Sequence, residues 1–285
     1  MYFYPFYQWL LFFFAYCFVG WIWETSYVTV TERHFVNRGF MYGTWIPIYG
    51  FGAIIMLFTT LPFKGNWVMV YLVGMVSATI LELVTGLTME KIFKIRYWDY
   101  SSQKIQFKGY ICLGSSLFWG LLSVVLVKWV HAFFEKLIFM IPGDIQIPLA
   151  FVLSAIFFTD LGFSIKSALD IRSVIVKLEK LREELERITD EFTEKVAEKA
   201  DELTDRVAEK ADEFTDKVEK KADELTDMML AKREELTRLV AERREELRDL
   251  SVRLIKRNPS AVLPTLPHMN EAVKEIRDRL RKRLK

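Results

Sequence analysis

Five charged side chains stand within or beside long apolar stretches of the sequence, where a charge is costly. They are Glu24, Arg38, Glu82, Glu90 and Asp99. A carboxyl group can act as an acid or a base, and an arginine can hold an anion. Inside a lipid bilayer such groups are tolerated when they pair with one another or face water, and they often mark the path of a polar ligand. These five residues are therefore candidates for a polar pathway.

The same residues have a purely structural interpretation, in which ion pairs only fix the packing of helices. Glu82 and Glu90 are eight positions apart, so on one helix both can point to the same side. Arg38 is the natural counter-charge for these acids, with Lys91 or Arg96 as alternatives. The sequence leaves the functional and the structural interpretation open.

The segment that holds these candidates is far more apolar than the rest of the chain. Only 20 of the 76 charged residues fall in residues 1–170, and the net charge of +2 over all 285 residues hides this uneven distribution. A helix that crosses a bilayer needs about 20 mostly apolar residues, because hydrocarbon cannot satisfy free backbone groups. Five stretches qualify, and they run from about Phe6 to Val30, Trp45 to Leu61, Trp67 to Thr88, Tyr110 to Val130 and Ile147 to Leu169. We therefore expect an all-α, polytopic transmembrane bundle of about five spans, surrounded by membrane lipid.

Positive residues in the connections between these stretches predict the orientation of the chain. Lys and Arg concentrate after the first stretch and after the third, and such residues usually face the cytoplasm. We expect the N-terminus outside the cell membrane and the chain after residue 170 inside. Most of the eight tryptophans lie near the ends of the stretches, a position typical of interfacial anchors. Charged residues within 128–142 either end the fourth helix or begin an interfacial one.

The remaining 115 residues have the opposite character and carry 56 charges. No Gly or Pro occurs between Phe163 and Asn258, so a long charged helix is expected over residues 171–258. Its apolar residues follow a heptad and then an 11-residue repeat, which keeps a narrow apolar seam on one face. This helix is a solvated spacer, a coiled coil that joins copies of the chain, or a helix adsorbed on a membrane. Residues 259–285 are expected to form a Pro-containing turn and a basic terminal helix, and a nucleic-acid partner is not expected.

The connection after the first apolar stretch is unusually rich in glycine. Its notable residues are Gly39, Phe40, Pro47, Tyr49 and Gly50. Irregular backbone at membrane depth is tolerated only where protein or a water-filled cavity covers it. The connection is therefore either a re-entrant loop or a place where small residues let helices pack closely.

Four motifs give the sequence a resemblance to a known family. They are Arg38-Gly39-Phe40, Pro47-Ile48-Tyr49-Gly50, Trp98-Asp99-Tyr100-Ser101 and Gly109-Tyr110-Ile111-Cys112-Leu113. Over about residues 6–122 the chain resembles the CmpB-like, ABC-transporter type IV family of bacterial multi-span membrane proteins. Thr44 stands where that family usually has proline, and Gln106 lies near a position that is commonly asparagine. The resemblance implies a permease-like protein and assigns no catalytic or binding residue.

Three classes of function are compatible with these features. A transport component would work with a separate ATP-binding subunit, because the sequence lacks a glycine-rich phosphate-binding loop, and the basic connection from Lys91 to Lys108 is its expected docking place. A membrane-anchored scaffold would use the helical tail to bind partners or a second copy. An intramembrane enzyme would use the buried carboxyl groups, but the sequence has no nucleophile elbow, no HExxH pair and no Cys/His cluster. No catalytic residue, metal or cofactor is therefore expected.

Overall fold

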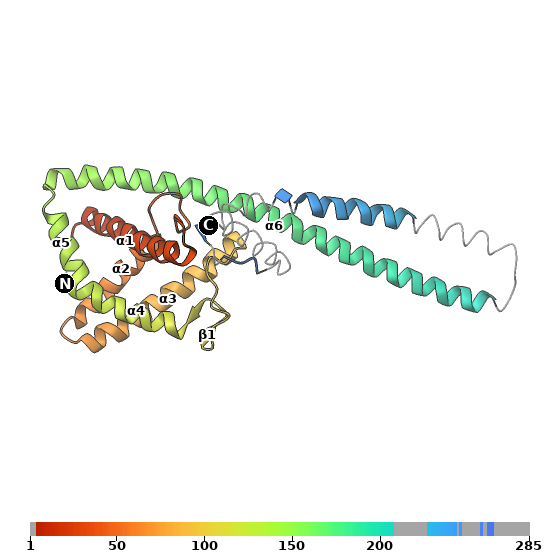
Figure 1. The fold of residues 1–285 in the computed structure, drawn as a ribbon, viewed down its shortest axis with the longest axis horizontal. Helices are drawn as coiled ribbons and strands as arrows, with labels where there is room; N and C mark the ends of the chain where they lie inside the picture. The colour runs from red at the N-terminus through yellow and green to blue at the C-terminus, as the bar shows by residue number, and fades with distance from the viewer. Residues whose placement is uncertain (1–3, 208–226, 244, 247–256, 259–260, 265–285) are drawn as a thin grey trace. The chain divides into compact units, whose positions relative to one another are not determined.

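The computed structural model describes residues 4–207, 227–243, 245–246, 257–258 and 261–264 (Figure 1). The chain divides into two compact units. The first, the membrane unit, contains residues 1–170 and 251–285, and the second, the tail unit, contains residues 171–250. The described residues 257–258 and 261–264 therefore belong to the same unit as the apolar N-terminal half.

Apolar helices build the membrane unit. They are α1 (Phe6–Glu32), α2 (Pro47–Thr60), α3 (Trp67–Phe93), α4 (Leu113–Val125), α5 (His131–Phe139) and the first part of α6 (Gly143–Val207), with a short 3-10 helix η1 (Leu61–Phe63) after α2. A π-helical segment η2 (Leu126–Val130) joins α4 to α5, and an antiparallel hairpin of β1 (Gln106–Phe107) and β2 (Ile111–Cys112) precedes α4. Figure 1 shows successive helices running back and forth, so the connection after α1 and the hairpin after α3 lie at one end of this unit, the loop end.

Four helical segments are long and apolar enough to cross a membrane: α1, α3, the continuous run Leu113–Phe139, and the apolar start of α6. The fifth expected span corresponds to α2 and η1, which form the shorter apolar helix Pro47–Phe63. It is shorter because the irregular segment 39–46 first runs along α1, where the Ile46 amide donates to the Cys17 carbonyl at 3.2 Å. The all-α, polytopic architecture expected from the sequence is confirmed.

The charged segment 128–142 continues the fourth span. The π-helical segment and α5 follow α4 without interruption, and the helix ends before Pro142. The Lys128 ammonium lies 5.5 Å from the Trp67 ring centroid and 4.5 Å from that of Trp129. These cation–π contacts stabilise a positive charge that the apolar sequence around it would otherwise disfavour.

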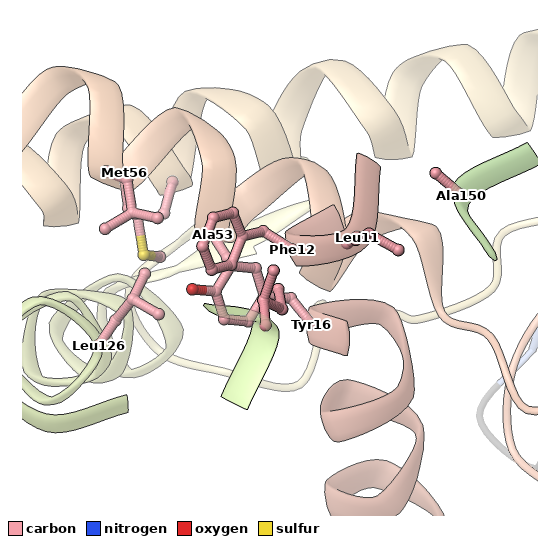
Figure 2. Packing of buried hydrophobic residues seen from close by; sticks show 10 residues of the cluster. Leu11, Phe12, Tyr16, Ala53, Met56, Leu126 and Ala150 are labelled. Carbon is pink, nitrogen blue, oxygen red and sulfur yellow. The ribbon is translucent and has the colours of Figure 1, made fainter. Parts of the chain in front are cut away.

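Aromatic, apolar and small side chains form the core between α1 and α2. Phe12 and Tyr16 of α1 pack with Ala53 and Met56 of α2, and Leu126 of η2 completes this part of the cluster (Figure 2). Phe12 is fully buried, and its ring lies at a centroid distance of 6.3 Å from that of Tyr16. The core therefore packs the first half of α1 and the middle of α2 against the π-helical segment.

The close approach of α1 and α2 depends on glycine. A Cβ on Gly50 would lie 2.5 Å from the Cys17 sulfur, and a Cβ on Gly20 would lie 2.3 Å from the Tyr49 ring. Atoms in well-packed proteins do not approach so closely, so a larger residue at either position would push the two helices apart. Close packing thus accounts for Gly50 of the glycine-rich connection.

The tail unit is helical throughout its described part. α6 continues to Val207, and residues 227–243 are helical again. Ile175 and Leu178 of α6 and Leu236 of the second stretch are buried, so part of the apolar seam is covered by other residues of the chain. The 11-residue repeat falls almost entirely outside the residues whose side chains the structure describes.

Candidate functional site

Glu82 is a buried acid in the second half of α3, with 4% of its surface exposed. Its carboxyl group accepts three hydrogen bonds, from the Tyr100 hydroxyl at 3.1 Å, the Ser115 hydroxyl at 3.2 Å and the Trp119 indole at 3.0 Å. None of the ion pairs that the described residues of the membrane unit form includes Glu82. Glu82 is therefore a buried acid held by neutral donors alone.

The start of α4 positions one of these donors. The Cys112 sulfur accepts a hydrogen bond from the Ser115 amide, and the Cys112 amide donates to the Ser115 hydroxyl, both at 3.3 Å. This reciprocal cap orients Ser115 towards Glu82. Burial raises the pKa of Tyr100, and the charge and hydrogen bond of Glu82 raise it further, so the Tyr100 hydroxyl remains a proton donor.

The hairpin that follows α3 positions the other loop-end residues. The Trp98 indole donates to the Tyr110 carbonyl at 2.9 Å, which ties the two arms of the loop together. Gly109 has a φ of 74°, a conformation that L side chains rarely adopt, and a Cβ there would lie 2.4 Å from the Asp99 carboxyl. The motifs at residues 98–101 and 109–113 thus build the loop that carries Tyr100.

Glu24, near the end of α1, forms a second acidic centre. Its carboxyl group forms an ion pair with the Arg38 guanidinium at 3.4 Å and accepts a hydrogen bond from the Tyr49 hydroxyl at 2.8 Å. The Arg38 amide donates to the Thr25 hydroxyl at 3.2 Å, so the connection after α1 folds back on that helix. Gly20 leaves the room in which the Tyr49 ring lies.

An aromatic contact joins the two acidic centres. The rings of Tyr49 and Trp119 meet edge to face with their centroids 5.6 Å apart. Tyr49 donates to Glu24 and Trp119 donates to Glu82, so one pair of rings separates the two carboxyl groups. The structure thus brings Glu24, Arg38 and Glu82 into one network.

Glu90 and Asp99 lie in a separate ion-pair cluster at the loop end. The Arg96 guanidinium contacts Glu90 at 2.7 Å and Asp99 at 3.3 Å, and it lies 4.6 Å from the centroid of the Tyr110 ring. Burial tends to lower the pKa of Arg96, but its hydrogen bonds and the charge of Glu90 outweigh burial and raise it. Arg38 is thus the counter-charge of Glu24, whereas Glu90 takes Arg96.

The irregular segment 39–46 is held by hydrogen bonds to α6. The Asp160 carboxyl group of α6 accepts hydrogen bonds from the Tyr42 amide at 3.0 Å and the Gly43 amide at 2.8 Å. Gly39 has a φ of 123°, which only glycine adopts without strain. Asp160 thereby satisfies backbone groups that the absence of a helix leaves free.

The remaining motif residues of this connection have clear packing roles. Phe40 packs against Phe93 and Tyr97, with ring centroids 5.4 Å and 5.6 Å away. Pro47 begins α2, a position where its missing amide hydrogen costs nothing. These contacts fix the loop end of α3 and the start of α2, and so the position of Tyr49.

The described end of the chain also reaches this network. The Arg38 guanidinium donates to the Asn258 side-chain oxygen at 2.8 Å, and the Asn258 amide group donates to the Gly39 carbonyl at 3.3 Å. Val262 and Arg96 exchange two backbone hydrogen bonds of 2.9 Å and 3.0 Å. Asn258 is 4% exposed, so the C-terminal segment covers the outer side of Arg38.

A second polar cluster lies at the opposite end of α1. The Tyr16 hydroxyl and a ring nitrogen of His131 are 2.7 Å apart, and the other ring nitrogen lies 3.3 Å from the Tyr4 hydroxyl. Tyr4 donates in turn to Glu135 at 2.5 Å. His131 is 1% exposed. No sequence motif links these four residues, which come from two distant segments.

Sequence reasoning also missed the donors around Glu82 and the partner of Arg38. Tyr100 and Ser115 lie in or beside the family motifs, which is a usable signal. Trp119 was expected to be an interfacial anchor, but its indole donates to Glu82 inside the unit. Asn258 lies 220 positions from Arg38, and nothing in the local sequence marks it.

The geometry favours binding and proton transfer over covalent catalysis. Glu82 and Glu24 can each hold a proton or a cation, and Arg38 can exchange one partner for another. Among the described residues no group of His, Cys, Asp and Glu could hold a metal ion.

Comparison with known proteins agrees with the motifs. The family model described as "Putative ABC-transporter type IV" matches residues 11–165. No curated protein and no solved structure matches the chain. The matched region is more than half of the chain and contains Glu24, Arg38 and Glu82. The family expected from the motifs is confirmed: this membrane protein belongs to the ABC-transporter type IV family.

Proposed function

We propose that the protein is the membrane-spanning component of a transport system and that the network of Glu24, Arg38 and Glu82 lies on its substrate path. The observation that carries the proposal is the environment of Glu82, a buried acid with three neutral donors and no ion pair among the described residues. Charged groups inside membrane helices are expensive, and those that lack a fixed counter-charge commonly serve ion or substrate movement.

The two acids suit complementary parts of such a path. Glu82 can gain or lose a proton, or meet a cationic group, without first breaking an ion pair. Glu24 shares Arg38 with Asn258, so a change in the C-terminal contact would alter the charge balance of Glu24. A path through these residues would open at the loop end, which we place on the cytoplasmic side because its connections are basic.

A separate ATP-binding subunit would supply the energy, and the hairpin after α3 is its proposed docking place. Lys104 and Lys108 are exposed there, as are two large apolar side chains, Ile105 at 65% and Phe107 at 51%. Exposed apolar residues ringed by positive charge are typical of a protein-binding surface.

Affinity purification of the tagged full chain from its native membrane tests this partner. We expect an ATP-hydrolysing subunit to co-purify in mild detergent and to be lost when Lys104→Glu and Lys108→Glu are combined. Lys64→Glu is the matched control, because Lys64 is equally exposed but lies in the connection after η1. Purification without any ATP-binding protein, or equal loss with Lys64→Glu, would argue against docking at the hairpin.

Cysteine labelling tests whether water reaches the path. Cys17 and Cys112 are free and buried, so both are first replaced, by alanine and serine. We expect Thr79→Cys, one turn before Glu82, to react with a small hydrophilic thiol reagent. Ile80→Cys is the control, because Ile80 is 56% exposed on the outer surface of α3 and would face lipid. An unreactive Thr79→Cys would contradict a hydrated path at this depth.

A scaffold is the second candidate, and the separate compact tail unit favours it. Deletion of residues 177–285 distinguishes the two, since a transport component should retain transport and a scaffold should lose its partners. Asn258→Ala in the full chain is the necessary control, because the deletion also removes the contact to Arg38. Retained transport in both variants favours the transport component.

A further inference from the structure

An apolar pocket of about 150 Å³ lies in the membrane unit between α1, α2 and α4 with η2. Val19, Met56, Leu122 and Leu126 are among the side chains that form its apolar walls. The pocket is open on one side, where Trp23 is exposed, and its volume is enough for a group about as large as benzene. The pocket is therefore suited to the apolar body of a small molecule.

Aromatic rings form one part of the pocket wall. Trp23 of α1, Tyr49 of α2 and Trp119 of α4 all line it. The faces of such rings carry partial negative charge and attract an organic cation, most strongly where water is excluded. An alkylammonium group among these rings would be stabilised without any direct ion pair.

The acids of the network lie directly beyond this aromatic wall. Tyr49 donates to Glu24, and Trp119 donates to Glu82, while Arg38 neutralises Glu24. Two acids and one arginine leave an excess of one negative charge when both acids are ionised. Charges act strongly over several ångströms in an apolar interior, so a cation in the pocket would be attracted and an anion repelled.

We propose that this pocket binds an organic cation, a compact apolar body that carries a quaternary or protonated ammonium group. The inference rests on the proposed transport function and names its substrate class. The ammonium group lies among Trp23, Tyr49 and Trp119, facing the charge of Glu82, and the apolar body lies against Val19, Met56 and Leu122.

The π-helical segment gives the pocket a means of admitting such a molecule. Leu126 and Val130, its first and last residues, both line the pocket. π-helical segments are rare and are often found at functional sites, because the extra residue weakens the regular helix locally. A small change in η2 would move Leu126 and Val130 without disturbing the hydrogen bonds of Trp119.

Equilibrium binding of three matched probes to the full chain in phosphatidylcholine nanodiscs tests the proposal. The probes are the cation benzyltrimethylammonium, its uncharged carbon analogue neopentylbenzene, and the anion phenylmethanesulfonate. We expect saturable binding of the cation, at least about tenfold tighter than that of the neutral analogue, from the combined cation–π and charge interactions, and no saturable binding of the anion. Equal affinity for the cation and the neutral analogue, or no saturable cation binding, would overturn the proposal.

Two variants assign the binding to this pocket. Glu82→Gln keeps an acceptor for Trp119 and removes the charge, and we expect it to weaken cation binding about tenfold while leaving the neutral probe unchanged. Trp23→Leu keeps an apolar side chain and removes the ring, and Trp23 is 53% exposed at the rim, so the fold should tolerate the smaller residue. We expect weaker cation binding with Trp23→Leu and partial recovery with Trp23→Phe. Unchanged cation affinity in both Glu82→Gln and Trp23→Leu would place the cation elsewhere and refute the proposal.

The labelling and co-purification experiments separate this inference from the transport role. If Thr79→Cys is labelled and the ATP-hydrolysing subunit co-purifies while the cation does not bind, the substrate class is wrong and the transport role stands. If the cation binds as described, the proposal is supported whichever subunit supplies the energy.

Discussion

Glu82 and Glu90 are the same residue type on the same helix, two turns apart, yet their surroundings differ completely. Glu82 is 4% exposed and accepts hydrogen bonds from three neutral groups. The Glu90 side chain is 21% exposed and forms an ion pair with Arg96. The spacing of two acids on a helix therefore says little about their roles, which depend on the partners that other segments bring.

The partners also predict different consequences for function. The cluster of Glu90, Arg96 and Asp99 holds the loop after α3 in place and has a counter-charge built in. Glu82 has none among the described residues, so a ligand or a proton can supply it. We therefore propose that Glu90 has a structural role and that Glu82 lies on the substrate path, and variants of the two residues test this difference.

The largest expected effect is the loss of transport in Glu82→Gln. The amide keeps a hydrogen-bond acceptor but removes the charge, and losing only about 1.4 kcal/mol of interaction with a substrate reduces binding tenfold. We expect complementation of a deletion strain to fall by about tenfold or more. Glu90→Gln is the matched control and should retain most activity. Equal activity of the two variants would end the functional distinction between the two acids.

The next largest effect is expected on the free energy of unfolding when the Glu82 hydrogen-bond acceptor is removed. Glu82→Leu leaves the donors of Tyr100 and Trp119 without an acceptor, whereas the Ser115 hydroxyl keeps the Cys112 carbonyl at 3.0 Å. Each buried unsatisfied group costs about 1–3 kcal/mol, so we expect a loss of about 2 kcal/mol or more, seen as a lower midpoint of thermal unfolding in uncharged detergent. Glu82→Gln should unfold close to the unaltered protein. If Glu82→Leu and Glu82→Gln lose the same stability, the charge of Glu82 rather than its hydrogen bonds stabilises this part of the fold.

The sequence predicted the candidates in this comparison but not what surrounds them. Apolar length predicted the helices, and the rarity of charge in the first 170 residues directed attention to Glu24, Arg38 and Glu82. Helical periodicity states which residues share a face of one helix, but it does not state which other helix covers that face. Trp119 therefore looked like a membrane anchor, although its indole donates to Glu82.

Contacts between distant segments were beyond sequence reasoning for a related reason. A short polar residue after a helix, such as Asn258, is common, and only the fold places it 2.8 Å from Arg38. The fold of the segment before α2 has the same origin, because the hydrogen bonds from Tyr42 and Gly43 to Asp160 satisfy backbone groups of an irregular segment. Hydrogen bonds to distant residues, Asn258 and Asp160, therefore determine the conformation of the glycine-rich connection.

A moderate effect is expected when the ion-pair cluster is broken. Arg96→Met keeps apolar length and leaves Glu90 and Asp99 without their counter-charge, at a cost of about 1–2 kcal/mol for partly exposed groups. The midpoint of thermal unfolding should fall by less than in Glu82→Leu, and transport should be largely retained. A fall as large as that of Glu82→Leu would show that the loop end is as critical to the fold as the buried acid.

The smallest effect expected is that of salt on stability, which should differ between the Arg96–Glu90 ion pair and the hydrogen bonds of Glu82. At about 1 M salt the Debye length shortens to about 3 Å, so the partly exposed pair of Arg96 and Glu90 is screened. The stability difference between the unaltered protein and Arg96→Met should then shrink by a few tenths of a kcal/mol. The stability difference caused by Glu82→Leu should not change, because salt hardly screens hydrogen bonds from buried neutral donors. Thermal unfolding of the three proteins at low and high salt measures both differences, and the general effect of salt cancels because it acts on all three. A salt-dependent cost for Glu82→Leu would mean that an unseen charge pairs with Glu82, and the contrast with Glu90 would lose its basis.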